Sequence, residues 1–303
     1  MRKFDIENKA SISSEKNVRV KQMNHIVEVM SLEKEFNGFQ GIIKLSKTHY
    51  CLKSTGEIFE YNLSENRSDN IAGLKSTFHK IRDLINSNFS GLGNELHVTL
   101  TYAENMTDVK KLLSDFQKFW QRYKWKYGNV DYLSVIEPQG RGAWHCHVLI
   151  RHNDLKKVYV PPDELARLWG NGFVKIKSLK GVDNIGAYLS AYLGDIELTD
   201  ETTKLAIRMQ NEKKLVIKEV EVEGVKKSII KGGRLHMYPS GMNLYRKSKG
   251  IVFPEVLKMS YKDAKKIVGS TNPNYSRTVT IHDDDGAVLN RISYESYNTQ
   301  RKV

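Results

Sequence analysis

The middle of the chain, residues 93–196, switches repeatedly between two spacings of apolar residues. A spacing of two is typical of strands, and a spacing of three to four is typical of helices that bury one face. Strands rich in β-branched and aromatic residues are predicted at 96–102, 132–137, 144–151 and 173–177. Helices are predicted at 108–127, 161–169 and 183–193, the first of them capped by Thr107.

The order of these elements indicates the fold. Strand, helix, strand, strand, helix and strand follow one another, and a further helix comes after them. The first six elements are those of a ferredoxin-like βαββαβ unit, in which the first and third strands lie at the centre of an antiparallel sheet. We therefore predict an α+β protein with a ferredoxin-like core, in which the strand at 144–151 is central.

The net charge of the chain indicates which class of molecule it binds. The chain carries 48 Lys and Arg against 35 Asp and Glu, a net charge of +13. This balance favours a nucleic-acid partner, because phosphates attract a basic protein and release their counterions when it binds. A basic enzyme that binds no nucleic acid is the alternative. The basic residues are spread along the chain and do not form a tail.

Two less regular regions flank the core, so we divide the chain into three parts. Residues 1–92 are predicted to be an N-terminal accessory region, residues 93–196 the core, and residues 197–303 a C-terminal accessory region that is a candidate for further DNA binding. The expected elements outside the core are strands at 41–45 and 57–61, helices at 72–86 and 259–268, and hairpins at 215–230 and around Asp283–Gly286. Residues 231–250 are basic, aromatic and glycine-rich.

Three features favour a cytoplasmic protein with no membrane partner. The N-terminus lacks the apolar core of a signal peptide. No apolar run approaches the roughly 18–20 residues that span a bilayer. The chain has only two cysteines, Cys51 and Cys146, so a disulfide framework is not expected.

A candidate metal site lies on the predicted strand at 144–151. His145 and His147 are two residues apart, so their side chains point to the same face of the sheet. A turn centred near Arg141 would bring Glu137 of the preceding strand opposite or diagonal to His145. Two imidazoles and one carboxylate leave coordination positions open for a phosphate oxygen.

This ligand set favours Mn²⁺ or Mg²⁺, with Zn²⁺ as the alternative. Cys146 points to the other face and is expected to be a small core residue. A different interpretation of His145 and His147 is that both rings are simply hydrogen-bonded within a sheet.

Two tyrosines lie one turn apart on the predicted helix at 183–193. Tyr188 and Tyr192 occupy one helical face, so both hydroxyls could reach a single site. A phenol is a poor nucleophile until it is activated or its target is polarised, and a metal-bound phosphate supplies the second condition. The alternative is a core-packed helix, because both tyrosines continue an apolar stripe that includes Ile185, Leu189 and Leu193.

Together these residues resemble the HUH endonucleases, the rolling-circle replication initiators of plasmids and single-stranded DNA phages. Three motifs follow the family's order over about 100 residues. They are Val98-Thr-Leu-Thr-Tyr102, then Glu137 with Gly140-Arg141 and His145-Cys-His147, then Tyr188-Leu-Ser-Ala-Tyr192. Residues 231–250 are also similar to a segment that lies downstream in plasmid- and phage-type Rep proteins.

The resemblance implies a mechanism. Glu137, His145 and His147 would hold the metal ion, and Tyr188 and Tyr192 would be the nucleophiles that form a 5′-phosphotyrosine bond. The DNA would be a single-stranded or hairpin origin, nicked at one site and later rejoined. No Gly-x-x-x-x-Gly-Lys-Ser/Thr loop occurs, so a host helicase and a host polymerase would be the protein partners.

One departure from the family pattern concerns a lysine. The family often has Lys directly before the second tyrosine, where this chain has Ala191. The role of that lysine would pass to Lys175, Lys177 or Lys180. These three lysines and Arg141 are the predicted DNA-binding residues.

Two other functions remain open. A relaxase or transposase would share the same catalytic chemistry, although circularly permuted relaxases place the tyrosine before the histidines, whereas here it follows them. A ferredoxin-like module that binds nucleic acid without cutting it is the second alternative. An RRM would carry a basic-aromatic motif on its third strand, and this strand carries His145-Cys-His147.

Overall fold

The computed structural model divides into two compact units. One unit spans residues 65–253, and the other combines residues 1–64 with residues 254–303. The structure describes residues 3–35, 42–46, 48–61, 71–139, 142–182, 184–194, 196–197, 217–222, 225–230, 234, 237–239 and 242–301.

The central unit, 65–253, is built on a five-stranded antiparallel sheet. Its strand order is β10-β7-β9-β8-β14. The strands are β7 (Glu95–Leu100), β8 (Val130–Pro138), β9 (Trp144–His152), β10 (Val174–Ser178) and β14 (Tyr245–Lys247). Strand β9 therefore has a hydrogen-bonded neighbour on each side. The first and third strands of the core, β7 and β9, are neighbours at the centre of the sheet, as the sequence predicted.

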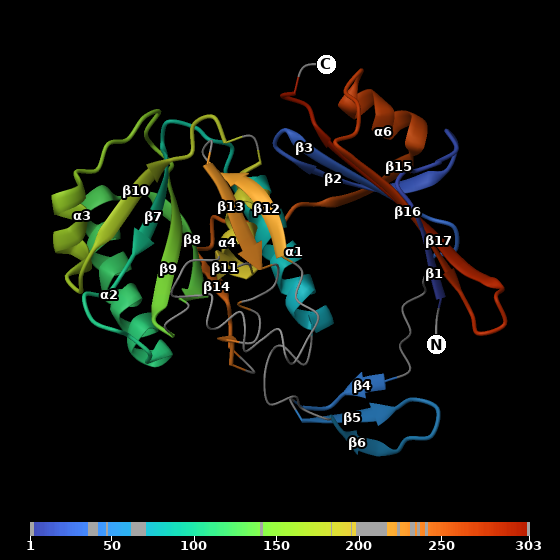
Figure 1. Cartoon of the computed structure of the whole chain (residues 1–303), viewed down its shortest axis with the longest axis horizontal. Helices are drawn as coiled ribbons and strands as arrows, with labels where there is room; N and C mark the ends of the chain where they lie inside the picture. Colours follow the sequence, from blue (N-terminus) through green and yellow to red (C-terminus); the bar gives the residue numbers. More distant parts are fainter. Residues whose placement is uncertain are drawn as a thin grey trace. The chain divides into compact units, whose positions relative to one another are not determined.

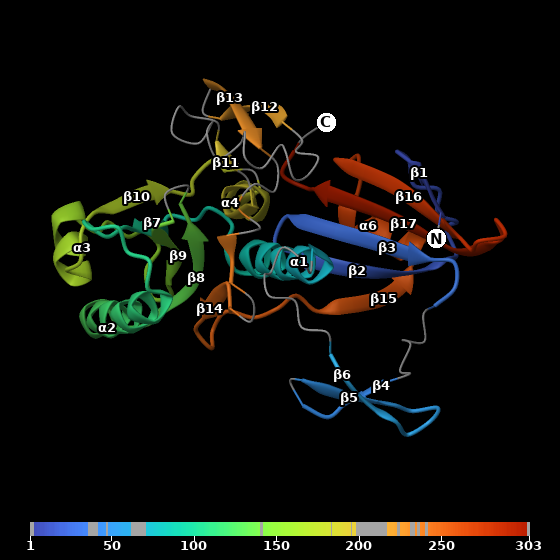
Figure 2. The ribbon, with the colours of Figure 1, turned by 60° about the horizontal axis from the view of Figure 1, so that its bottom comes forward.

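Helices cover both faces of this sheet. They are α1 (Ile71–Asn88), α2 (Val109–Tyr127), α3 (Pro162–Trp169) and α4 (Ile185–Gly194). Figures 1 and 2 show α2 and α3 on one face, and α1 and α4 on the other. The fold is α+β with antiparallel sheets, as predicted, and its strand order is compatible with a ferredoxin-like core.

The cap of α2 differs from the prediction. Asp108 caps this helix, and its carboxylate accepts hydrogen bonds from the backbone N–H groups of Lys110 and Lys111. Thr107 lies one residue too early for this role, and its carbonyl instead accepts a hydrogen bond from the Trp144 indole at 3.0 Å. The charged carboxylate also suits the positive end of the helix dipole.

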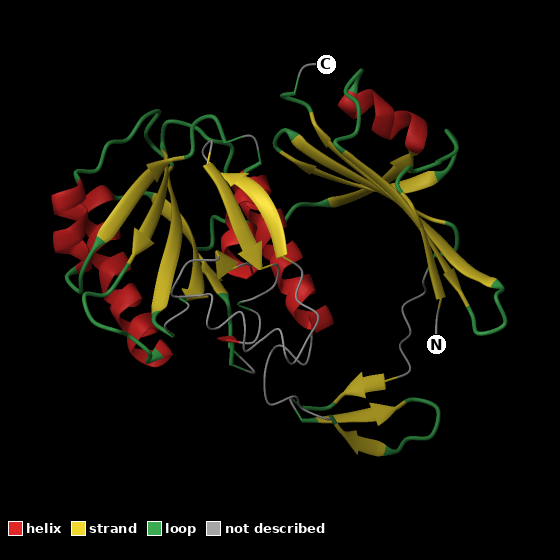
Figure 3. Ribbon diagram, in the orientation of Figure 1, coloured by secondary structure: helices red, strands yellow, loops and turns green. Residues whose placement is uncertain are grey.

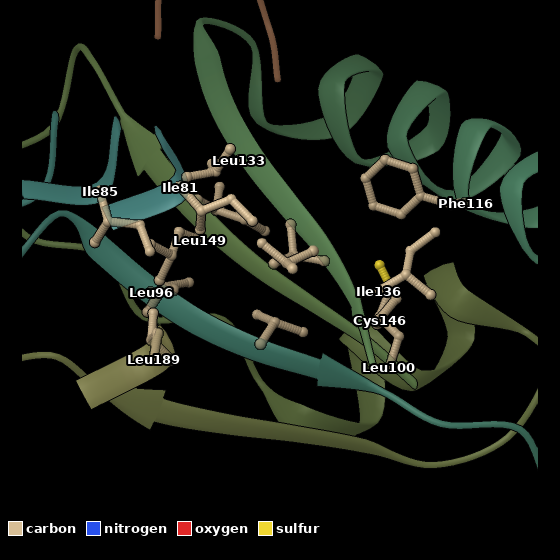
Figure 4. Packing of buried hydrophobic residues seen from close by; sticks show 14 of the residues in the cluster. Ile81, Ile85, Leu96, Leu100, Phe116, Leu133, Ile136, Cys146, Leu149 and Leu189 are labelled. Atoms are coloured by element: carbon tan, nitrogen blue, oxygen red, sulfur yellow. The ribbon is translucent and has the colours of Figure 1, made fainter. Parts of the chain in front are cut away.

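Two layers of apolar side chains hold the sheet between its helices. On one face, Phe116 of α2 lies beside Ile136 and Cys146 (Figure 4). Cys146 is fully buried there, which confirms that it is a core residue on the face away from His147. On the other face, Leu133 and Leu149 pack with apolar residues of α1 and α4, which are Ile81, Ile85 and Leu189.

The predicted hairpin at 215–230 is present in the central unit. Strands β12 (Ile217–Val222) and β13 (Val225–Ile230) pair antiparallel, and β11 (Ile196–Glu197) adds to the other edge of β13. The turn at 223–224 lies outside the described residues.

The second unit joins the two ends of the chain in one sheet. Its strand order is β1-β16-β17-β3-β2-β15, and α6 (Tyr261–Val268) packs on one face (Figure 3). The strands are β1 (Lys3–Glu7), β2 (Asn17–Met23), β3 (Ile26–Leu32), β15 (Val256–Ser260), β16 (Tyr275–His282) and β17 (Val288–Asn298). A small sheet of β4 (Ile42–Lys44), β5 (His49–Leu52) and β6 (Ile58–Glu60) belongs to the same unit.

The boundaries of these units differ from those of the three regions expected from the sequence, 1–92, 93–196 and 197–303. The difference arises because β17 pairs with β3 and β15 pairs with β2, so both ends of the chain share one sheet. Helix α1, expected in the N-terminal region, packs against α4 in the central unit. Across the described ranges, none of the helices combines the length and the apolar character needed to cross a bilayer.

The turn before β10 generates a stability prediction. Gly172 has φ +148°, and a Cβ atom there would lie 2.4 Å from the Ala103 nitrogen and 2.6 Å from the Thr101 oxygen. We expect Gly172→Ala to lower the free energy of unfolding by about 3 kcal/mol, because both the backbone strain and the backbone clash act. Urea unfolding of the purified protein measures this loss.

The matched control is Gly170→Ala. Gly170 also has a positive φ, +71°, but its added Cβ would meet only the Arg167 oxygen at 3.7 Å. The expected loss is therefore about 1 kcal/mol, from the left-handed backbone alone. Equal losses in the two variants would show that the close approach at Gly172 is not what constrains this turn.

Candidate functional site

The candidate site lies where β8 and β9 run side by side, on the face of the sheet that α1 and α4 cover. Glu137 is the direct partner of His145 in the register of the two strands, as the expected turn required. His147 lies two residues further along β9, opposite Val135 on one side and Thr99 of β7 on the other. Alternation along the strands puts Glu137, His145 and His147 on one face.

The two ring nitrogens of His147 have different neighbours. Its Nε2 contacts Glu137 Oε2 directly. Its Nδ1 lies 3.2 Å from His97 Nε2 and 3.3 Å from Thr99 Oγ1. A carboxylate can only accept, so Nε2 carries the ring proton and Nδ1 accepts from its neighbours. Glu137 thus fixes both the tautomer and the orientation of the ring.

Burial keeps the two neighbouring imidazoles neutral. It lowers the pKa of His147 to about 4, assisted by the positive charge of Lys177. It lowers the pKa of His97 to about 3, assisted by the positive charge of Lys177 and by that of His147 when this ring is protonated. Both rings are therefore uncharged near neutral pH, which is the form that a metal ion requires of a histidine ligand.

His97 is a site residue that the sequence reasoning missed. It lies on β7 beside the Val98–Tyr102 motif and is 5% exposed. The signal was present in the sequence. His97 and Thr99 are two residues apart, so their side chains point to the same face of β7, which pairs with the strand that bears His147.

Arg234 is a second residue that was missed. Its guanidinium contacts Glu137 Oε1, and its Nη1 donates to the Pro138 carbonyl at 2.9 Å. Nearby, the Tyr238 hydroxyl donates to the Ile136 carbonyl at 3.3 Å. The only sequence signal was the basic, glycine-rich character of residues 231–250, which identifies no single residue.

Helix α4 brings Tyr188 to the same face of the sheet. The helix approaches α1 closely because Gly186 has no side chain, and the Gly186 N–H donates to Asn86 Oδ1 at 2.9 Å. Ile185 and Leu189 are buried, so the apolar stripe does pack in the core, while Tyr188 is only half-buried. Tyr192 lies on the same helix, and its side chain is outside the described part of the chain.

A lysine from β10 reaches the tyrosine. Lys177 Nζ donates to the Tyr188 hydroxyl at 3.4 Å. Lys177 is the strand partner of His97, and Lys175 is the partner of Thr99, so both lysines belong to the face of the candidate site. Lys175 and Lys180 are exposed, Lys180 lies beyond the end of β10, and Arg141 is outside the described residues.

The chemical types of the candidate ligands are those that bind a divalent ion. Two imidazoles and a carboxylate share one face, and one imidazole already contacts the carboxylate. Among the described residues, however, no group of three or more His, Cys, Asp or Glu side chains is placed so that it could hold an ion. Both oxygens of Glu137 are in contact with other side chains, His147 and Arg234. The metal therefore remains a proposal.

Comparison with known proteins finds a similarity for the central part of the chain. Residues 95–197, about a third of the chain, match the family model of the replication-associated protein ORF2. This stretch contains β7 to β10 and α4, and with them Glu137, His145, His147 and Tyr188. The match is consistent with a rolling-circle Rep protein. No curated protein and no solved structure matches the chain.

The contact between Glu137 and Arg234 generates a second stability prediction. Their side chains are 6% and 16% exposed, so removing one partner leaves a nearly buried charge without its counterion. We expect Glu137→Gln and Arg234→Met each to lower the free energy of unfolding by about 3 kcal/mol. The double variant should lose clearly less than the sum of the single losses.

Urea unfolding in the presence of a chelator measures all three variants. The chelator removes any contribution from bound metal. The difference between the double-variant loss and the sum of the two single losses then reports the ion pair alone. Strictly additive losses would contradict the pairing of Glu137 with Arg234.

Proposed function

We propose that this protein is a rolling-circle replication initiator of the HUH endonuclease type, which nicks and rejoins single-stranded DNA at an origin. One observation carries the proposal: Glu137 and His147 are in contact beside His145 on the face that also bears Tyr188. The similarity of residues 95–197 to replication-associated proteins supports it independently.

Glu137, His145 and His147 are the proposed ligands of a divalent ion, Mn²⁺ or Mg²⁺. Such an ion would polarise the scissile phosphate and stabilise the charge that develops on it. Within the chain, His97 and Thr99 orient His147 through its Nδ1, so that Nε2 faces Glu137. For Nε2 to bind an ion, the proton that it donates to Glu137 would have to leave, and Nδ1 would then carry the ring proton and donate to Thr99 Oγ1 or His97 Nε2.

Tyr188 is the proposed first nucleophile. Its hydroxyl loses its proton, the Oη–phosphorus bond forms, and the bond from phosphorus to the 3′ oxygen breaks. The released 3′ oxygen takes up a proton and becomes the primer for a host polymerase. Lys177, whose Nζ donates to the Tyr188 hydroxyl at 3.4 Å, is proposed to orient the phenol and to contact the phosphate, in place of the lysine that the family often has where this chain has Ala191.

The phosphotyrosine bond has about the energy of the phosphodiester bond that it replaces, so the strand can be rejoined. Tyr192, one helical turn from Tyr188, is the proposed nucleophile of that second transfer. Lys175, Lys180 and Arg141 are proposed to hold the DNA backbone, in keeping with the net charge of +13. A host helicase would open the origin, in the cytoplasm.

The covalent step is tested with a labelled single-stranded origin oligonucleotide and Mn²⁺. We expect a protein–DNA adduct with the wild-type chain and none with the Tyr188→Phe/Tyr192→Phe double variant. Mass spectrometry of the digested adduct locates the modified tyrosine. An adduct of undiminished yield in the double variant would show that another residue attacks the phosphate.

The control for this experiment is His147→Ala. This variant should bind the oligonucleotide as well as the wild type but form no adduct. Undiminished adduct in this variant, or in excess chelator, would contradict the metal-dependent mechanism. Tight binding by the wild-type chain without any cleavage would favour a binding module instead, and strand transfer into a second duplex would favour a transposase.

The contact between Lys177 and Tyr188 predicts a loss of rate. We expect Lys177→Met to slow adduct formation in a single turnover by on the order of ten- to a hundredfold, because the positive charge beside the phenol is gone. Lys175→Met is the matched control, since Lys175 is exposed on the same strand and face. It should weaken DNA binding and leave the rate at saturating DNA unchanged. Equal rate losses in both variants would mean that Lys177 only attracts DNA.

A further inference from the structure

We propose that the exposed surface of α2 binds a second stretch of DNA, in which an unpaired base stacks on Trp125 and basic side chains hold the phosphates. The inference goes beyond the proposed nicking activity and does not depend on it. Helix α2 covers one face of the sheet, and α4, which bears Tyr188, covers the other (Figures 1 and 2). DNA bound at α2 is therefore separate from the nucleotides that would lie at Tyr188.

Trp125 differs from the other three tryptophans of the chain. It is 90% exposed near the C-terminal end of α2. Trp144 and Trp169 are buried in the core. Trp120 is half-buried, and its ring centroid lies 4.4 Å from that of Tyr132. Large apolar surface in water is unfavourable, and tryptophan is enriched at positions that carry binding energy, so the exposed ring indicates a contact with a partner.

The surface around Trp125 is strongly basic. All six Lys and Arg side chains of α2 are exposed, and the only acidic residue of this helix is the buried Asp115. Asp115 and Glu164 form ion pairs with three of the six, which are Lys111, Lys118 and Lys126. Within the described ranges, no carboxylate pairs with the other three, which are Lys110, Arg122 and Lys124. This excess of positive charge complements a phosphate backbone.

The helix brings two of these cations to the face that bears the indole. Arg122 lies three residues before Trp125, and Lys118 lies seven residues before it, so all three side chains share one face of α2. Along the helix axis, the cations are roughly 5 Å and roughly 10 Å from Trp125. Arg122 Nη2 donates to the Trp169 carbonyl at 3.2 Å, which fixes one of the five donors of the guanidinium and holds it at this face.

An unpaired strand suits this surface better than a duplex. The bases of a duplex are already paired and stacked on one another, so none of them can lie on a side chain. Unpaired bases stack on aromatic rings with little dependence on sequence, while basic side chains follow the backbone. A second copy of the chain is the other occupant that an exposed ring could take, but two copies of this basic surface would repel each other.

Binding of a labelled oligothymidylate to the full chain tests this surface. The titration is monitored by fluorescence anisotropy in chelator, which prevents the proposed metal-dependent cleavage. We expect Trp125→Ala to weaken binding about tenfold, because one stacking contact is lost, and Trp125→Phe to keep most of the affinity. Tyr159→Ala is the matched control, since Tyr159 is 79% exposed in the same unit but lies outside α2, and it should bind like the wild type.

Tryptophan emission reports the stacked base directly. A base on Trp125 quenches its fluorescence, so the oligonucleotide should quench the wild type more strongly than Trp125→Phe, although both bind. Urea unfolding like that of the wild type shows that each variant is folded. Equal affinity of the wild type and Trp125→Ala, or no binding by the wild type, would overturn the proposal. Self-association that Trp125→Ala abolishes, with unchanged DNA affinity, would assign the surface to a second copy instead.

The phosphate contacts are tested with the two lysines that flank Trp125. We expect Lys124→Gln to weaken binding and to make the slope of log affinity against log salt concentration shallower by roughly 0.7. Lys126→Gln is the matched control, because Glu164 already pairs with Lys126 at 2.8 Å, and it should leave the slope nearly unchanged. An unchanged slope in Lys124→Gln would contradict phosphate binding along α2. Neither result bears on the nicking of an origin, which the adduct experiment tests separately.

Discussion

The register between β8 and β9 is the constraint on which the candidate site depends. It makes Glu137 the partner of His145 and puts His147 on the same face. Because side chains alternate along a strand, a slip of one residue would turn Glu137 away from both histidines. Strand β9 also pairs with β7, which brings His97 and Thr99 to the other side of His147. The polar contacts of the site therefore follow from backbone pairing.

Burial on both faces fixes that register. Cys146 and Val148 on one face of β9 and Leu149 on the other are each at most 3% exposed. A slip of one residue would move these side chains to the opposite face and bring His145 and His147 into the apolar layer under α2, so the core selects the pairing that assembles the site. The cost of enclosing Glu137 is offset locally, since each of its oxygens contacts a donor, Arg234 or His147.

Local patterns were sufficient to predict most of the central unit from the sequence. The spacing of apolar residues located its strands and helices, and the parity of 137, 145 and 147 predicted their shared face. Pairing between distant segments was not predictable in this way. Nothing in their composition indicates that β1 pairs with β16, β3 with β17 and β2 with β15. Likewise, nothing in residues 231–250 selects Arg234. Such contacts depend on the whole fold, because many arginines could satisfy one carboxylate.

The central claim is that Glu137, His145 and His147 bind one divalent ion beside Tyr188. Crystals of the full chain soaked in Mn²⁺ test it most directly, through the anomalous scattering of the metal. The account predicts one strong peak within about 2.0–2.4 Å of a Glu137 oxygen and of one nitrogen from each histidine. A fully occupied Mn²⁺ ion elsewhere in the chain, with the Glu137–His147 contact intact and no peak beside it, would contradict the account.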